Sequence, residues 1–284
     1  IGDVLLSTPV IENLTQIYEN SQIDFAINAE CKDMVSLNPN INKLIIYDRK
    51  LQTGLISKLK LELAYIKSIR KTQYDIVINL TEGDRGVITS LCSKAILKIG
   101  FKPRKGILKH INVFDNYGED YAKVHTIDKD LQFITLLEKK ILSKRVSIYW
   151  DQHDADIVDD ILKEQNVHIF IQVHPVSRWM FKCWEDDRMA KIIDKLQENK
   201  NTKVVITASP DKIEQARVNS IMALCDNKPI NLMGKLTLRQ LAYLSSRSEF
   251  YFGIDSAPMH MAAAVGTPVF ALMGGSEAIH WGPW

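Results

Sequence analysis

The sequence lacks several features that would place it in a common class of protein. Only 4 cysteines occur among 284 residues and none forms a C-x-x-C pair, so neither a zinc site nor a disulfide scaffold is indicated. No apolar run approaches ~18 residues and no signal peptide is visible, so we expect no transmembrane helix. The net charge of +2 is too small to predict nucleic-acid binding. These absences favour a cytoplasmic protein without a nucleic-acid partner.

Several ligand-binding motifs are missing as well. The 13 glycines form no G-x-G-x-x-G and no G-x-x-x-x-G-K-[ST] motif, which removes the main support for a dinucleotide dehydrogenase or a P-loop enzyme. The 7 histidines show no H-E-x-x-H or other ligand-like pairing, so we expect no metal ion. The sequence starts with Ile-Gly-Asp and stops after Gly-Pro-Trp, and we expect both ends to be cut inside longer motifs.

The sequence does contain a regular alternation of β-rich apolar runs and amphipathic helical patterns. The first half predicts strands at 22–29, 43–48, 74–80 and 95–101, with helices at 59–71, 85–95 and 126–140. The second half predicts strands at 168–175, 203–208, 249–255 and 268–274, with helices at 186–199, 212–225, 236–247 and 258–266. This alternation is typical of α/β folds whose parallel sheets are covered on both faces.

The two series of strands indicate two domains. A charged segment without strand patterns, at 151–166, separates them. We therefore expect two Rossmann-like domains, at 1–160 and 161–284. Ligands in open α/β sheets bind beyond the carboxyl ends of the strands, so the cleft between the domains is the expected site.

A polar cluster follows the predicted strand at 249–255. Asp255 and Ser256 are good N-cap residues, and Pro258 suits the first turn of the next helix. The start of that helix would offer N–H groups and a positive dipole to a phosphate, with His260 in reach. In the alternative interpretation, Asp255 and Ser256 only cap the helix and His260 is a surface residue. Spacing alone leaves both open.

Three further groups of residues are candidates for chemistry. Ser177 and Lys182 follow the predicted strand at 168–175, where a lysine could neutralise phosphate; the alternative is a solvated surface lysine. Asp3 precedes an apolar run and is either a general base or a helix cap. The basic cluster at 101–110 either meets an acidic substrate or is simply solvated; its candidate binding residues are Lys102, Arg104 and Lys105.

Four segments, read together, resemble a known family. IGDVLLSTPVIENL (1–14), HPVSRWMFKCW (174–184), TASPDKIEQARVNSI (207–221) and GIDSAPMHMAAAVGTPVFALMG (253–274) resemble the signature regions of glycosyltransferase family 9, the ADP-heptose:lipopolysaccharide heptosyltransferases. The second segment looks most like the heptosyltransferase III branch. The resemblance implies a GT-B fold, in which two Rossmann-like domains face a central cleft. It also implies that the first strand and the C-terminal end of the family lie outside this sequence.

The resemblance assigns roles to residues. Asp3 matches the proposed general base, Lys182 a lysine on the donor phosphates, Ser177 a nearby hydroxyl and Glu214 an acid that holds the ribose. Many members have Asp-Thr-Gly-Leu where this chain has Asp-Ser-Ala-Pro, so one backbone N–H is missing at the proline. The residues that match the diphosphate cradle are Asp255, Ser256, Ala257, Pro258 and His260.

The resemblance also implies a reaction. It is the inverting, metal-independent transfer of L-glycero-D-manno-heptose from ADP-heptose to a heptose of the lipopolysaccharide inner core. The N-terminal domain would take the acceptor and the C-terminal domain the ADP-heptose, with no further cofactor. Peripheral contact with the cytoplasmic face of the inner membrane is then expected. The alternatives are a GT-B transferase for another nucleotide sugar, or a nucleotide-binding module without transferase activity.

Overall fold

The computed structural model describes residues 1–48, 54–104, 106–119, 123–199 and 201–284. Contacts within the chain divide it into two compact units. Unit 1 consists of Ile1–Leu5, Asp33–Asn38 and Val146–Trp284, and unit 2 of Leu6–Lys32 and Pro39–Arg145. All strand pairs of the described residues are parallel, and both units combine strands with helices. The predicted α/β class is therefore confirmed.

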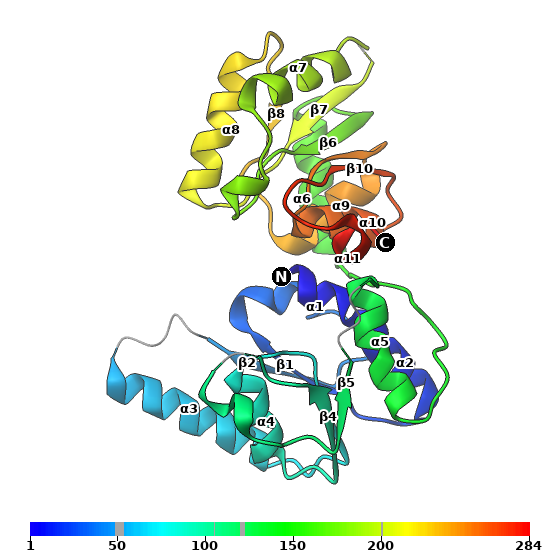
Figure 1. The fold of residues 1–284 in the computed structure, drawn as a ribbon. Helices are drawn as coiled ribbons and strands as arrows, with labels where there is room; N and C mark the ends of the chain where they lie inside the picture. The colour runs from blue at the N-terminus through cyan, green and yellow to red at the C-terminus, as the bar shows by residue number, and fades with distance from the viewer. Residues whose placement is uncertain (49–53, 105, 120–122, 200) are drawn as a thin grey trace. The chain divides into compact units, whose positions relative to one another are not determined.

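Unit 1 contains a five-stranded sheet in the order β10-β9-β6-β7-β8 (Figure 1). From β6 the chain proceeds outward through β7 to β8, and then returns to place β9 on the other side of β6. The strand order therefore reverses between β6 and β9, which makes this the topological switch point of the sheet. The strands are β6 (Phe170–His174), β7 (Lys203–Ile206), β8 (Ile230–Asn231), β9 (Tyr251–Ile254) and β10 (Val269–Leu272).

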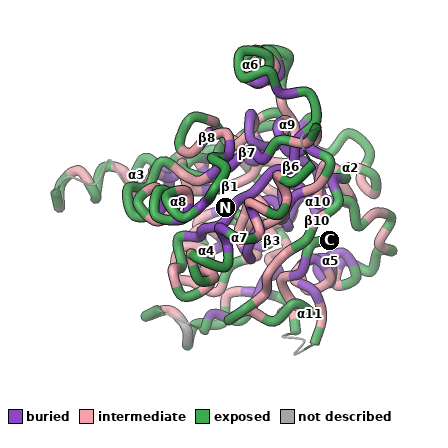
Figure 2. Tube along the Cα trace, turned by 90° about the horizontal axis from the view of Figure 1, so that it is seen from above, coloured by how far each residue is buried: buried purple, intermediate pink, exposed green. Residues whose placement is uncertain are grey.

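The inner strands of the sheet of unit 1 are buried along most of their length (Figure 2). Two separate apolar cores pack against this sheet. One core joins β6 and β7 to the buried faces of α7 and α8. A second joins Tyr251 of β9 to Met259 and Ala262 of α10. The helices of this unit are α6 (Gln152–Glu164), α7 (Asp186–Leu196), α8 (Lys212–Leu224), α9 (Leu238–Arg247), α10 (Ala257–Ala264) and α11 (Ala278–Trp281), with the 3-10 helix η4 (Met180–Lys182).

Unit 2 contains two small parallel sheets. β1 (Asp24–Asn28) pairs with β2 (Lys43–Tyr47), while β3 (Ile76–Asn79), β4 (Leu97–Phe101) and β5 (Asn116–Gly118) form the second sheet. Its core includes Phe101 and Phe133, whose rings meet edge to face with centroids 4.8 Å apart. The helices are α2 (Thr8–Ile17), α3 (Leu55–Arg70), α4 (Asp84–Ser93), α5 (Thr126–Leu136) and the 3-10 helix η3 (Ile107–His110). Helix α1 (Gly2–Leu6) and the 3-10 helix η1 (Ala29–Met34) each pass from one unit to the other.

The charged segment at 151–166 differs most from its prediction. It forms helix α6 and belongs to unit 1, whose main segment begins at Val146 rather than at 161. Asp151 and Asp154 form a reciprocal capping box at its start, and Asp154, which is buried, pairs with Arg239 of α9 at 3.0 Å. Buried Val158 and Leu162 complete the packed face. The segment expected to separate the domains is therefore an amphipathic helix of unit 1.

Candidate active site

The switch point of unit 1 brings together two of the segments that the sequence singled out. In sheets of this topology, ligands bind in the crevice beyond the carboxyl ends of the two strands at the reversal. Here those ends are His174 of β6 and Ile254 of β9. His174 lies opposite Gly253, where a Cβ would come within 2.5 Å of the His174 carbonyl oxygen. Only glycine allows the strands to approach this closely.

Lys182 and Asp255 connect the two loops that leave these strands. Lys182 lies in η4 after β6, Asp255 follows β9, and Lys182 Nζ donates to Asp255 Oδ2 at 2.6 Å. The Asp255 side chain is 6% exposed and that of Lys182 is 19% exposed. Lys182 is therefore not a solvated surface lysine. An ammonium group has three N–H donors, so Lys182 can hold Asp255 and bind an anion at the same time.

The N-cap side chain does not occupy the backbone N–H groups at the start of α10. Ser256 occupies the N-cap position, but no side chain caps the helix. The Ser256 hydroxyl instead donates to the Ile254 carbonyl at 3.2 Å, and the Asp255 carboxylate accepts from Lys182. His260 is buried, at 5% exposure. The capping alternative and the surface position for His260 are thus not what the structure shows. Ala257 and Pro258 form the first two positions of the helix.

Asp3 follows Gly2, a residue that packs against this helix. A Cβ added to Gly2 would lie 3.4 Å from His260 Cδ2 and 3.9 Å from Ala257 Cα, so the start of α1 packs against the start of α10 within unit 1. Asp3 is the second residue of α1 and is exposed. It therefore sits inside the first turn of its helix, next to the residue that contacts α10.

Ser177 and Glu214 are buried and stabilise the loops around the switch point. Ser177 Oγ accepts from the Trp179 N–H at 3.2 Å. Glu214 Oε2 accepts from the Ser209 N–H, also at 3.2 Å, in the loop that follows β7. Ser177 and Glu214, which were predicted to contact the sugar donor, therefore already stabilise the fold. Their contacts with a ligand stay predictions.

His174 is a buried polar residue of this region that sequence reasoning did not select. It ends β6, and its Nδ1 lies 3.0 Å from the Thr207 hydroxyl beyond β7. Burial lowers the pKa of His174 to about 4. The imidazole is therefore neutral at physiological pH and adds no positive charge to the crevice. A histidine at the end of a strand that was predicted to be buried was the available signal.

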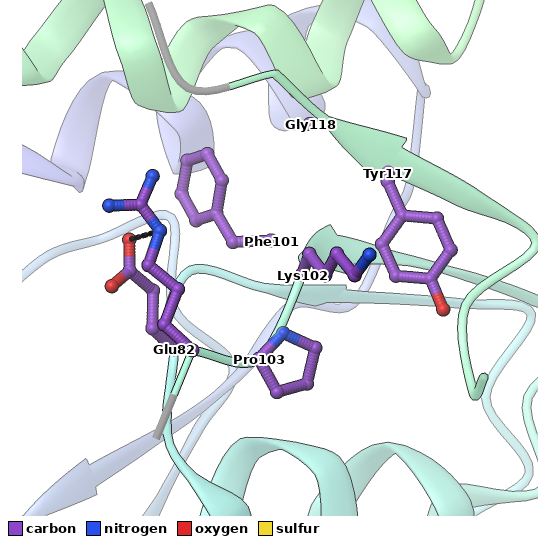
Figure 3. A pocket seen from close by; sticks show the side chains of 7 residues that line it. Glu82, Phe101, Lys102, Pro103, Tyr117 and Gly118 are labelled. Atoms are coloured by element: carbon purple, nitrogen blue, oxygen red, sulfur yellow. Dashed lines mark ion pairs between the residues drawn. The ribbon is translucent and has the colours of Figure 1, made fainter. Parts of the chain in front are cut away.

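Unit 2 has a cavity of about 420 Å³ at the carboxyl ends of its three-stranded sheet. Glu82 beyond β3, Phe101 at the end of β4 and Tyr117 in β5 line it together with Lys102 and Arg104 (Figure 3). Two of the predicted acceptor residues, Lys102 and Arg104, therefore share one cavity. The third, Lys105, lies outside the described residues.

The charges around this cavity are mostly positive. Glu82 Oε1 lies 3.7 Å from Arg104 Nε and 3.4 Å from Lys129 Nζ, so one carboxylate faces two cations. The Lys102 side chain is exposed and extends toward the ring of Tyr117 in Figure 3. Among the described residues that line the cavity, Lys102 and Arg104 outnumber the one acid, Glu82, and this positive balance suits an anionic ligand.

The described part of the chain shows neither a metal-binding cluster nor a membrane-spanning helix. No three His, Cys, Asp or Glu side chains there are grouped in a way that could hold a metal ion. None of the helices in that part is both long and apolar enough to span a bilayer.

Comparisons with known proteins assign the chain to a family. The sequence profile of Glycosyltransferase family 9 (heptosyltransferase) matches residues 62–284. Lipopolysaccharide heptosyltransferase 3 of Escherichia coli is 32% identical over 295 residues, which cover 100% of this chain and 82% of that protein. A crystal structure of a family 9 glycosyl transferase from Veillonella parvula has a TM-score of 0.86 at 24% identity, covering 100% of this chain and 81% of its own.

A second solved structure agrees in fold. The Escherichia coli heptosyltransferase WaaC with ADP has a TM-score of 0.77 at 15% identity, covering 100% of this chain and 87% of its own. Together with the two α/β units, this confirms the predicted GT-B class. Since the family profile covers most of the chain and the Escherichia coli relative aligns over all of it, the chain belongs to glycosyltransferase family 9, the heptosyltransferase family that its motifs resemble.

Proposed function

We propose that this glycosyltransferase moves a heptose from ADP-heptose to a heptose of the lipopolysaccharide inner core, with inversion at the anomeric carbon. The observation that carries the proposal is the Lys182–Asp255 pair beside the uncapped start of α10, at the switch point of unit 1. Two similar proteins support it. One relative is a lipopolysaccharide heptosyltransferase 3, and WaaC has been solved with ADP and with ADP-2-deoxy-2-fluoro heptose.

The donor diphosphate would rest at the switch point. The Lys182 ammonium, held by Asp255 at 2.6 Å, would face the phosphates together with the N–H groups at the start of α10. His260 is in the same helical turn. Ser177 and Glu214 would shape the loops against the nucleotide. Positive charge that is already in position stabilises a leaving ADP as its negative charge grows, without reorganisation during the reaction. We infer that this makes a metal ion unnecessary.

Asp3 would activate the acceptor. Its carboxylate takes the proton from the acceptor hydroxyl as that oxygen bonds to the anomeric carbon, while the bond from this carbon to the diphosphate breaks. Attack from the face opposite the leaving group inverts the configuration and releases ADP. The contact between Gly2 and the start of α10 supports the placement of Asp3 near the donor.

The acceptor would be bound by unit 2. The cavity near Lys102 and Arg104 has a positive balance, which fits the acidic groups of a core oligosaccharide. We further propose that the enzyme works at the cytoplasmic face of the inner membrane, where a lipid-linked acceptor would be present.

The test is product analysis. The protein is incubated with ADP-heptose and a truncated core lipid that ends in heptose, and the product is analysed by mass and linkage. We expect one added α-linked heptose, also in the presence of a metal chelator. Transfer from UDP- or GDP-sugars in place of ADP-heptose, or no transfer from any donor, would contradict the proposal.

A further inference from the structure

Helix α3 of unit 2 carries apolar side chains on two opposite sides. On one side, Tyr65 and Ile69 are buried against Ile45 and Tyr47 of β2. A surface helix of a globular protein normally has a single apolar stripe and a polar opposite face. In α3 the face opposite Tyr65 also carries apolar residues, which form a second stripe. Packing in the core of unit 2 does not account for this second stripe.

The second stripe is exposed. Ile56, Leu59 and Leu63 are 74%, 60% and 58% exposed. At ~100° of rotation per residue, these three positions fall within one sector of the helix, on the side away from Tyr65 and Ile69. Figure 2 shows α3 as mostly exposed or intermediate. Three large, neighbouring apolar side chains with this exposure mark an interaction surface rather than scattered surface residues.

Cations lie on the same side as the apolar residues. By the same rotation, three exposed basic residues fall in this sector, namely Lys60, Lys67 and Arg70. We call the surface that they form with Ile56, Leu59 and Leu63 the α3 outer face. The only acid in the helix, Glu62, falls on the buried side, near Ile69, and accepts hydrogen bonds from Arg85 and Tyr47, both at 2.6 Å. The outer face therefore presents apolar groups and positive charge without an opposing carboxylate.

We propose that the α3 outer face docks on an anionic lipid bilayer. Helices that lie in a membrane surface combine an apolar stripe with lysine and arginine, whose aliphatic stems lie along the apolar region while their charges reach the headgroups. Anionic headgroups attract such cations and the acyl boundary takes the leucine and isoleucine side chains. A second copy of the same face is a poorer partner, because it would set three cations against three cations.

The partner class rests on the proposed function, since a core-lipid acceptor is presented by a membrane. Docking through unit 2, which contains the cavity near Lys102, would keep the acceptor-binding unit at the lipid surface.

The experiment measures binding to vesicles by co-sedimentation. One set of vesicles is pure phosphatidylcholine and the other is an equimolar mixture with phosphatidylglycerol. We expect the full chain to bind the mixed vesicles and to bind pure phosphatidylcholine at least ~10-fold more weakly. Leu59→Ser with Leu63→Ser should abolish binding, and Lys60→Gln with Lys67→Gln should weaken it on the order of 10-fold or more. Each variant changes exposed side chains, and circular dichroism checks that it folds.

A matched control comes from α8 in unit 1, where Ile213 is 66% exposed next to Lys212. Ile213→Ser with Lys212→Gln should bind like the unchanged chain. Equal binding by the α3 variants, equal binding to both vesicle types, or a dimer in solution that only the α3 variants dissociate would overturn the proposal. Transfer to a water-soluble acceptor is measured in parallel. The α3 variants should retain it, so a failure of docking and a failure of the proposed reaction are distinguishable.

Discussion

Lys182 and Asp255 are 73 positions apart in the sequence and share a hydrogen bond of 2.6 Å. Both were predicted to face the donor, but their pairing was not, because the sequence does not say that β6 and β9 are neighbours. Asp255 also has the local pattern of an N-cap, and only the structure shows that its carboxylate turns to the lysine. The pair therefore fixes the position of a cation at the switch point before any ligand binds.

Lys182→Ala should reduce both stability and donor binding. It leaves the nearly buried Asp255 carboxylate without its cation, at a cost of about 1–3 kcal/mol, between the values typical of exposed and fully buried ion pairs. Urea unfolding and calorimetry with ADP measure the two effects. Adding Asp255→Asn should recover part of the stability but not the ADP affinity. Unchanged affinity in Lys182→Ala would show that this lysine does not contact the donor.

Asp3→Asn should reduce transfer about 100-fold or more, the usual contribution of a general base, and leave ADP affinity unchanged. Steady-state rates and calorimetry test this. Asp187→Asn is the matched control, because Asp187 is also an exposed acid in the first turn of a helix of unit 1. Both changes remove a favourable interaction with a helix dipole, and only the first should slow the reaction. Similar rates for both variants would reduce Asp3 to a structural role.

At the scale of the element, the strand predictions succeeded where the apolar runs were long and failed where they were short. Strands such as β6 and β9 were predicted to within a few residues, because buried parallel strands read as continuous apolar runs. β5 and β8 have only 3 and 2 residues, too few for a pattern. The segment of helix α6 was assigned to the boundary between the domains, because its charges outnumber its apolar positions. The reversal of strand order, at which the candidate site lies, is a tertiary property that no local pattern contains.

The end of β6 gives a pH prediction. The folded pKa of His174 is about 4, against 6.5 for an unperturbed histidine. Between these values the unfolded chain takes up a proton that the folded chain does not, so the free energy of unfolding falls as pH falls. The loss should begin near pH 6.5 and reach about 3 kcal/mol below pH 4.

Urea unfolding at pH 7 and at about pH 5 measures this loss. His174→Asn should make the stability less dependent on pH in this window. His168→Gln serves as control, because His168 is exposed, and it should keep the dependence of the unchanged chain. The same pH dependence in His174→Asn would assign it to other groups.

At the scale of the whole molecule, the two units divide the candidate residues. The donor candidates and Asp3 belong to unit 1, whereas the basic cavity belongs to unit 2. The sequence led to an N-terminal domain at 1–160 that includes Asp3. The structure instead groups Ile1–Leu5 with the segment that begins at Val146, since the start of α1 packs on α10. A division drawn along the sequence could not anticipate that a terminal helix joins the distant unit.

This division predicts separable kinetic effects. Lys102→Gln with Arg104→Gln should raise the acceptor KM about 10-fold for each lost charge-assisted contact, while the ADP-heptose KM and kcat stay near their original values. Initial rates at varied concentrations of each substrate test this. Lys43→Gln, an exposed lysine elsewhere in unit 2, is the control and should change neither constant. An unchanged acceptor KM in the double variant would place the acceptor elsewhere.

The chain passes between the two units after Leu5, Lys32, Asn38 and Arg145. A gene fragment that starts at codon 146 would therefore encode the five-stranded sheet without two pieces that belong to it. Its product would leave the His260 side of α10 bare where Gly2 now touches it. An isolated unit 1 would have to be expressed as a permuted chain, with Ile1–Leu5 rejoined to it through an artificial linker.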